Sequence, residues 1–562
     1  MIDLYSSQHQ LSPKVQCFSK LALMFIFSFW SGESLAQTQV CEMRLKVPSL
    51  GGAANAVVDL KEAQRWKAFK NQRVQERLQE ALSPQLIYAS YRIENAEIEK
   101  GCVDLAEMID IGRGLFLRQF TRAEGYGHAI PNRRAKSRIQ SGHFGGPDAG
   151  ACVDCHWKGG FAGSGDRVDN TYAFGDGQNL DLADARNPPA LWGAGWVQAL
   201  AVEMSTDLQV QRDLGIEKAK KNNTSLVIQL ESKGVYFGTL QISAQGEVDT
   251  TKIEGIDVDL QIKPFGWKGV FGSLREFVEI SAHKHLGMQS EYLTMGSYHE
   301  VDLGSNLDRM DPDQDGKLRE LTEAQILSLV SFLATLDTPK IEMPTHGKRS
   351  PPSKLEEVEF IDTPAFIERW QKGSHLFEQI GCSECHRPFL RLDNPKVKTP
   401  WYRFIGGKVG GKKFFEIDLS QEAALPHPEM KRILSKETGE NNMDHQSSRS
   451  TIRSKTKKVW LVPVFSDFKR HKMGAYLRSK HIERGVEKDE FLTRRLWGLR
   501  KTSPYLHHGG AMTFEEAIAA HGGEGSEAKE AAELYVSLNS GEKNSLILFL
   551  SSLSRGPAIR IR

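Results

Sequence analysis

The pentapeptide Cys-x-x-Cys-His occurs twice in this 562-residue chain, at 152–156 and at 382–386. This spacing is typical of covalent haem attachment, in which two thiols form thioethers with the haem and the adjacent histidine binds the iron. One copy also suits half a zinc site or a redox dithiol. Two copies favour a protein with two covalently bound haem c groups. The attachment residues are then Cys152, Cys155, Cys382 and Cys385, and the proximal iron ligands are His156 and His386.

The first 36 residues have the features of a cleaved signal peptide. Lys14 and Lys20 precede an apolar run from Leu21 to Trp30, and small residues follow up to Ala36. This order predicts export, with cleavage after Ala36. The apolar run is too short to span a bilayer. We therefore expect a periplasmic protein without stable membrane insertion.

The remaining cysteines and the net charge fit that location. Cys17 is lost with the signal peptide, and Cys41 and Cys102 remain as an even pair in an oxidising compartment. We predict a disulfide between them, with two free thiols as the alternative. A formal charge of +2 gives no electrostatic reason to expect binding to nucleic acid.

A Pro- and Ser-rich stretch at 343–355 lies between the two motifs and is typical of a linker. It predicts an N-terminal domain at 37–342 and a C-terminal domain at 356–562. Both sides repeat a local pattern. Gly-x-x-Leu-Phe precedes each motif, at 112–116 and 373–377, and an Arg followed by Leu-Trp-Gly comes after each, at 186–193 and 494–498. The repetition indicates two related haem lobes.

Helices dominate the expected secondary structure, so we predict a mainly α fold. Apolar residues at helical spacing predict helices over 57–80, 324–336 and 540–553, and the Gly-x-x-Leu-Phe segments suit a helix leading to each motif. Alternating residues at 234–243 and 256–262 predict a small β-rich insertion in the N-terminal lobe. The segments 406–413 and 437–455 are expected to be exposed loops.

Taken together, these residues resemble the bacterial di-haem oxidoreductases of peroxidase type. That family is related to the di-haem cytochrome c peroxidases and to the methylamine-utilisation di-haem enzyme. The resemblance covers roughly residues 108–553. Besides the two motifs it rests on the segments 264–269, 285–289, 311–322, 496–510, 513–517 and 521–524. It implies two cytochrome c-like lobes whose haems face a shared interface.

The ligand at the sixth coordination site of each haem iron distinguishes an electron-transfer haem from a catalytic one. A second strong ligand closes an electron-transfer haem, and methionine in that place raises the potential. The resemblance implies such a methionine on the C-terminal haem, for which Met473 is the candidate and His471 the competitor. For the N-terminal haem we prefer His285 to His283, because His285 opens the family-like segment 285–289. It would ligate reversibly or act as the base that moves a peroxide proton; a surface or interlobe histidine is the alternative.

Further side chains are candidates for proton transfer, electron transfer and haem binding. Glu279 and Glu203 are the candidate proton-transferring carboxylates, although most such residues lie on helix surfaces. Tryptophans at equivalent places in the two repeats, Trp192 and Trp497, together with Trp196, are candidates for an aromatic bridge between the haems, with core packing as the alternative. Arg186 and Arg494 resemble partners of the haem propionates.

The acidic loop at 311–322 is a candidate Ca²⁺ site. Oxygen-bearing side chains at alternate positions precede a glycine, an order that suits Ca²⁺, and the candidate ligands are Asp311, Asp313, Asp315 and Glu320. The twelfth position holds Thr322 instead of the usual glutamate. A helix-capping acidic turn is the alternative.

We therefore expect a periplasmic di-haem oxidoreductase that reduces hydrogen peroxide or another small oxidant. A small donor, such as a cytochrome c or a cupredoxin, would supply electrons that pass from the C-terminal to the N-terminal haem. One alternative is a di-haem oxidase or oxygenase that acts on an organic or protein substrate. Another is a non-catalytic di-haem electron carrier.

Overall fold

The structure is a computed structural model, and it describes residues 91–127, 139–140, 147–295, 316–317, 319–336, 338, 364–405, 408–422 and 459–553. The expected signal peptide, the helix at 57–80, the linker and the loop at 437–455 lie outside these residues. Within them, no helix combines the length and apolar character that a membrane crossing requires.

Two crossing helices frame the first motif. Helix α7 (Leu105–Leu117) is capped at its N-terminus by Asp104, whose side chain accepts a hydrogen bond from the amide of Glu107. It packs against α12 (Glu323–Ala334). The helices touch at Gly112, where a Cβ atom would lie only 1.9 Å from the carbonyl oxygen of Ser328. The short helix α8 (Cys152–Cys155) packs against α7 and carries the first motif.

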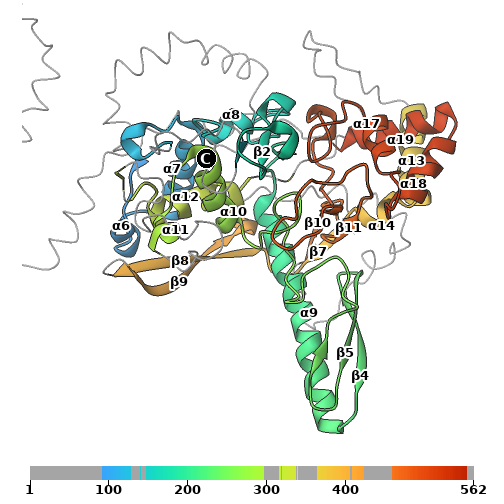
Figure 1. Cartoon of the computed structure of the whole chain (residues 1–562), viewed down its shortest axis with the longest axis horizontal. Helices are drawn as coiled ribbons and strands as arrows, with labels where there is room; N and C mark the ends of the chain where they lie inside the picture. The colour runs from blue at the N-terminus through green and yellow to red at the C-terminus, as the bar shows by residue number, and fades with distance from the viewer. Residues whose placement is uncertain are drawn as a thin grey trace, which may run out of the picture.

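The second motif has the same frame. Helix α13 (Pro364–Gln379) packs against α19 (Ser540–Ser552), and α14 (Cys382–Cys385) follows α13. Here the contact is at Gly373, where a Cβ atom would lie 2.0 Å from the carbonyl oxygen of Ser545. Figure 1 shows the two helix pairs on opposite sides of the molecule. The predicted helices at 324–336 and 540–553, and those before each motif, are confirmed.

A long helix, α9 (Ala194–Asn222), runs from the centre of the molecule into a projecting arm (Figure 1). The antiparallel strands β4 (Leu226–Ser232), β5 (Val235–Ile242) and β6 (Val248–Asp249) lie beside it. The predicted strand at 234–243 is therefore confirmed. The one at 256–262 is wrong, because the chain turns there and Leu260 adopts a positive φ of 60°.

A second hairpin was not expected. Strands β8 (Lys396–Ile405) and β9 (Lys408–Asp418) pair antiparallel, so the loop predicted at 406–413 is wrong. Val397, Thr399 and Trp401 point inward, and charged residues alternate with the first two. This period of two is the pattern of a half-buried strand.

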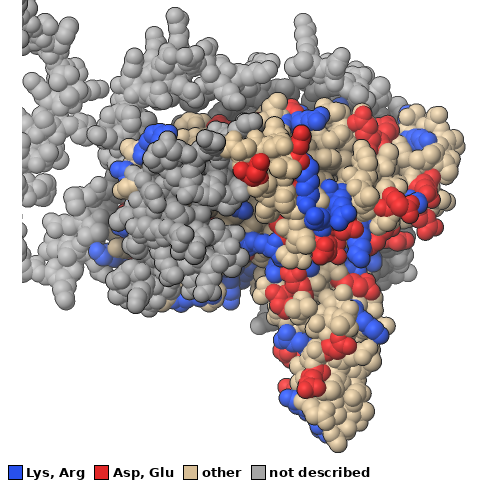
Figure 2. All heavy atoms as spheres, in the orientation of Figure 1, with Lys and Arg blue, Asp and Glu red and all other residues tan. Residues whose placement is uncertain are grey.

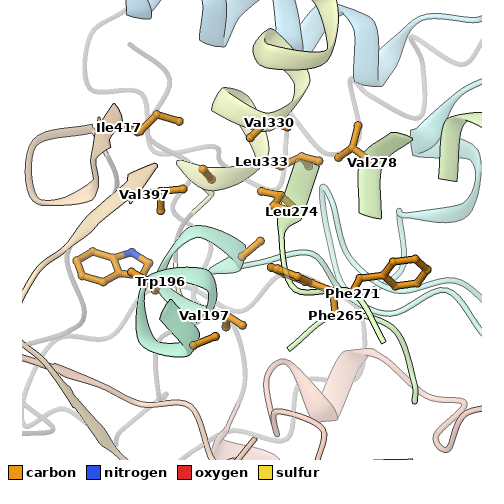
Figure 3. Close-up of a cluster of buried hydrophobic side chains, with 14 of the residues drawn as sticks. Trp196, Val197, Phe265, Phe271, Leu274, Val278, Val330, Leu333, Val397 and Ile417 are labelled. Carbon is orange, nitrogen blue, oxygen red and sulfur yellow. The ribbon is translucent and has the colours of Figure 1, made fainter. Parts of the chain in front are cut away.

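One core joins segments from both sides of the predicted linker. Figure 3 shows Trp196 of α9, Leu274 and Leu333 clustered with Val397 of β8 and Ile417 of β9. All five are buried. The β8–β9 hairpin, which follows the second motif, thus packs on elements that precede the linker.

The remaining elements are short. They are α6 (Asn95–Glu99), η1 (Arg122–Glu124), β1 (Ile139–Gln140), η2 (Arg167–Asp169), β2 (Thr171–Ala173), η3 (Leu180–Leu182), β3 (Asp184–Arg186), α10 (Leu274–Ser281), the π-helix η4 (Ala282–Leu286), α11 (Glu291–Met295), β7 (Leu390–Leu392), α15 (Leu419–Glu422), β10 (Trp460–Val462), β11 (Arg470–Lys472), β12 (Glu490–Leu492), η6 (Leu499–Lys501), α17 (Phe514–Ala520) and α18 (Lys529–Ser537).

Candidate functional site

The first motif holds its histidine in one orientation. His156 follows α8, and its Nδ1 lies 3.0 Å from the carbonyl oxygen of Pro189 and 3.2 Å from that of Gly163. A histidine that donates Nδ1–H to a backbone carbonyl presents Nε2 as a metal ligand. Burial lowers the pKa of His156 to about 4, so the ring is neutral and able to ligate.

The second motif repeats this arrangement. Nδ1 of His386 lies 3.1 Å from the carbonyl oxygen of Phe465, and burial lowers the pKa of His386 to about 4. Burial raises the pKa of the motif thiols Cys152 and Cys382 to about 12. Each site therefore offers two thiols and one oriented imidazole.

The structure brings His285 to the first motif. His285 lies in the π-helix η4, and its electrostatic effect contributes to the lowered pKa of His156. Its Nδ1 is 2.9 Å from a carboxylate oxygen of Asp148, whose side chain is almost fully buried. His283 is itself buried. Of the two candidate histidines, His285 thus carries a defined acid–base partner.

Asp148 is a residue that the sequence did not reveal. Its backbone amide and that of Ala149 both donate to the carbonyl oxygen of His285, so this short segment packs directly on η4. Tyr126 lies nearby: burial raises the pKa of its hydroxyl, with Asp154 and Asp148 adding to the effect. No local motif marks Asp148, because it lies 137 residues from its partner histidine.

Glu279 belongs to a buried ionic cluster one helical turn before η4. Arg275 is 2.8 Å from Glu279 and also pairs with Glu323, and Ser290 donates to Glu279 at 2.8 Å. Burial raises the pKa of Glu279, against the effect of Arg275, and raises that of Glu323 to about 7. The cluster also fixes the β8–β9 hairpin, because the amide of Tyr402 donates to Glu323 at 2.8 Å.

Glu203 is held in a structural network on α9. Its carboxylate is 2.7 Å from Nζ of Lys233 and accepts the backbone amides of Asp393 and Asn394. These contacts tie the arm to the segment after β7. They do not support the catalytic role predicted for Glu203.

The paired tryptophans interlock. A Cβ atom on Gly498 would lie 2.2 Å from the ring of Trp192, and one on Gly193 would lie 2.5 Å from the ring of Trp497. Each tryptophan therefore packs against the glycine that follows its counterpart. Trp196 instead packs on Trp460, with ring centroids 5.9 Å apart.

The two predicted propionate partners have different surroundings. Arg186 already has an acidic partner, since Nη2 is 3.1 Å from Glu483. Arg494 lies over the ring of Trp267 at 4.7 Å and donates to the carbonyl oxygen of Gly266. Burial lowers the pKa of Arg494 to about 10. The pKa of the adjacent Arg495 is also lowered, first by burial and then by the positive charge of Arg494. Among the described residues, no acidic side chain forms an ion pair with either of these two arginines.

The two candidate ligands near the second motif also differ. Both ring nitrogens of His471 are taken, with Nε2 2.8 Å from Asp467 and Nδ1 2.7 Å from Glu527. These contacts do not support His471 as an iron ligand. Met473 packs in a small apolar cluster with Leu477, Phe491 and Ala520.

The predicted Ca²⁺ site falls mostly on residues outside the described part of the chain, including Asp311, Asp313 and Asp315. Glu320 is described and buried, and it accepts the backbone amide of Gln289. Cys102 is disulfide-bonded. Its predicted partner, Cys41, lies outside the described residues.

Two matched Cys-x-x-Cys-His sites, each with an oriented histidine, are the arrangement expected of a di-haem protein. Residues 441–553 match the family model described as "Di-haem oxidoreductase, putative peroxidase". A similar curated protein is the cytochrome-c peroxidase IdrP2 of Pseudomonas sp. (strain SCT), which is 41% identical over 93 residues. That match covers 16% of this chain and 23% of the relative, so the chain spans about a quarter of the relative's length. The C-terminal segment 441–553 is therefore similar to the di-haem oxidoreductase family.

The residues present fit the haem groups that this family implies. Each motif presents a neutral histidine with Nε2 available, as haem iron requires. Arg494 and Arg495 are partly buried cations without an acidic partner among the described residues, and the two propionates of a haem are anions suited to them. This second observation comes from charge, independently of the motif spacing.

Proposed function

We propose that this protein is an exported di-haem c-type oxidoreductase that reduces hydrogen peroxide at its N-terminal site. Both haems are attached through their motif cysteines, and electrons pass from the C-terminal to the N-terminal site. The observation that carries the proposal is the His285–Asp148 pair beside the first motif. It gives the first site a proton-transfer group with a fixed tautomer.

Peroxide reduction requires a proton to leave one oxygen and reach the other as the O–O bond breaks. Bound haem supplies the iron and the electrons for this cleavage. Asp148 accepts Nδ1–H of His285, so Nε2 of His285 can act as a base. It would take the proton from one peroxide oxygen and deliver it to the other oxygen, which leaves as water. The hydroxyl of Tyr126, near Asp148, is a second proton donor at this site.

The interlocked tryptophans provide the route between the two halves in this proposal. Trp192 follows the first motif and Trp497 the second, and each packs against the other's glycine. The indole Nε1 of Trp192 donates to the carbonyl oxygen of Phe161 at 2.7 Å, which fixes the ring close to the first motif. Aromatic rings in continuous packing favour electron transfer over the gap that they fill.

A small periplasmic donor completes the reaction. Figure 2 shows acidic and basic side chains interspersed over the arm that α9 forms. The formal charge of the whole chain is only +2. We therefore expect the donor to dock through a local patch of complementary side chains. A long-range attraction to a surface of uniform charge is not expected.

Steady-state turnover tests this proposal. Purified holoprotein should oxidise a reduced small cytochrome only when hydrogen peroxide is present. Failure to consume peroxide, whether the C-terminal haem is oxidised or reduced beforehand, would contradict the proposed activity.

A further inference from the structure

A third histidine in the chain has the orientation of a metal ligand. His521 follows the last residue of α17, and its backbone amide donates to Ile518 at 3.0 Å instead of to Ala517. The carbonyl oxygen of Ala517 is one of the orphan acceptors at the helix C-terminus. The side chain of His521 satisfies it, with Nδ1 at 2.7 Å from that oxygen.

This contact leaves Nε2 of His521 as the ring atom that can bind a metal. Donation from Nδ1 to a backbone carbonyl fixes the same tautomer as in His156 and His386. Burial lowers the pKa of His521, so the ring is neutral. Among the described residues, no group takes up Nε2.

The position of α17 directs this histidine to the second site. Phe514 and Ile518 of α17 pack on the same core as Cys382 and Phe465, the residue whose carbonyl orients His386. This packing places α17 beside the second motif.

The rival ligands are less well prepared. His471 has carboxylates on both ring nitrogens. Met473 has its backbone amide bonded to Asp489 at 2.8 Å, and its side chain packs in the apolar cluster with Leu477 and Phe491. A thioether packed in this way is well accounted for as an apolar side chain.

We propose that Nε2 of His521 is the second axial ligand of the iron bound by His386. This inference rests on the proposed haem attachment at the second motif and replaces Met473 as the sixth ligand. Two imidazoles stabilise ferric iron more than one imidazole and a thioether do, since methionine ligation raises the potential. The C-terminal haem then has a lower potential than His/Met ligation would give, and its donor must be a correspondingly stronger reductant.

The wild-type ferric holoprotein provides a test that needs no variant. With His521 as ligand, its spectrum should lack the near-infrared charge-transfer band of a methionine–iron(III) bond. Electron paramagnetic resonance should show a low-spin signal of a bis-imidazole haem. A methionine–iron band would overturn the ligand assignment. If haem is bound and peroxide is consumed, that result leaves the proposed function intact.

Two variants then assign the ligand. His521→Gly should lose the low-spin signal of one haem, and added imidazole should restore it. Met473→Leu is the matched control and should keep both the signal and the reduction potential. Loss of the signal in Met473→Leu but not in His521→Gly would overturn the assignment. Haem content, measured as the pyridine haemochrome, separates these outcomes from a protein that carries no haem, which would overturn the proposed function as well.

Discussion

Histidines in this protein differ in what their Nδ1 atoms contact, and that contact separates the roles proposed for them. His156 and His386 donate to backbone carbonyls, whereas His285 contacts a buried carboxylate. A carboxylate stabilises the imidazolium that forms when Nε2 takes up a proton, and a carbonyl does so less strongly. The first two therefore suit metal ligation, and His285 suits proton transfer.

The role of His285 gives the first prediction. His285→Gln should lower kcat/KM for hydrogen peroxide by about 10²–10⁴-fold, the usual contribution of a positioned general base. The haem content should not change. His481→Gln is a matched control, because His481 also pairs with an aspartate, Asp184, and is equally exposed. Equal activity of the two variants would contradict the role of His285.

The buried carboxylate of Glu323 predicts a pH dependence of stability. Burial raises its pKa from 4.5 to about 7 in the folded protein, so the folded state binds the proton more tightly than the unfolded state. This contribution is fully present below about pH 4.5 and is lost as the pH rises through about 7. The free energy of unfolding should therefore fall over this interval, and less steeply in Glu323→Gln. Denaturant titrations at several pH values would show this, and parallel curves would contradict it.

At the scale of single elements, the helices around the two motifs were predictable from the sequence, and the way they pack and the β8–β9 hairpin were not. The segments that form α12 and α19 have a local apolar periodicity, and the Gly-x-x-Leu-Phe repeats marked α7 and α13. The hairpin alternates Lys396 and Lys398 with the buried Val397 and Thr399, whereas the sequence predicted only an exposed loop at 406–413. Its burial depends on the ionic cluster of Arg275, which lies more than a hundred residues earlier.

The crossing glycines give a prediction about stability. Gly112→Ala and Gly373→Ala should each lower the free energy of unfolding by about 1–3 kcal/mol, the usual cost of overpacking, since the new methyl would overlap a backbone carbonyl. Gly411→Ala is the control, because nothing lies within 4 Å of its Cβ position. Thermal or denaturant unfolding measures the difference. An unchanged free energy of unfolding in Gly373→Ala would contradict the close contact between α13 and α19.

At the scale of the whole molecule, the sequence located both cofactor motifs but not the groups that surround them. Trp192 and Trp497 were paired by their places in the two repeats, and the structure shows how their rings interlock with the opposite glycines. Asp148 and Arg495 had no such signal, because their significance depends on groups distant in sequence or, for Arg495, on the lack of an acidic partner within the described part of the chain. His521 stood in a family-like segment without an assigned role.

The interlock predicts slower electron transfer between the two sites in Trp192→Phe and Trp497→Phe. A smaller ring opens a gap at the glycine of the opposite repeat and interrupts the packed route. The reduced holoprotein can be mixed rapidly with peroxide and followed by absorbance. The rate to measure is that of oxidation of the C-terminal haem, which follows oxidation of the N-terminal haem. Trp157→Phe is the control, because Trp157 is exposed. Unchanged rates in both interlock variants would exclude this route.

We propose that two unequal haem sites reduce peroxide with electrons relayed from the second to the first. Rapid mixing of fully reduced holoprotein with one equivalent of hydrogen peroxide tests it most directly. Both haems should become oxidised in a single turnover, and His285→Gln should slow this oxidation. Two haems that stay reduced in the presence of peroxide would contradict it.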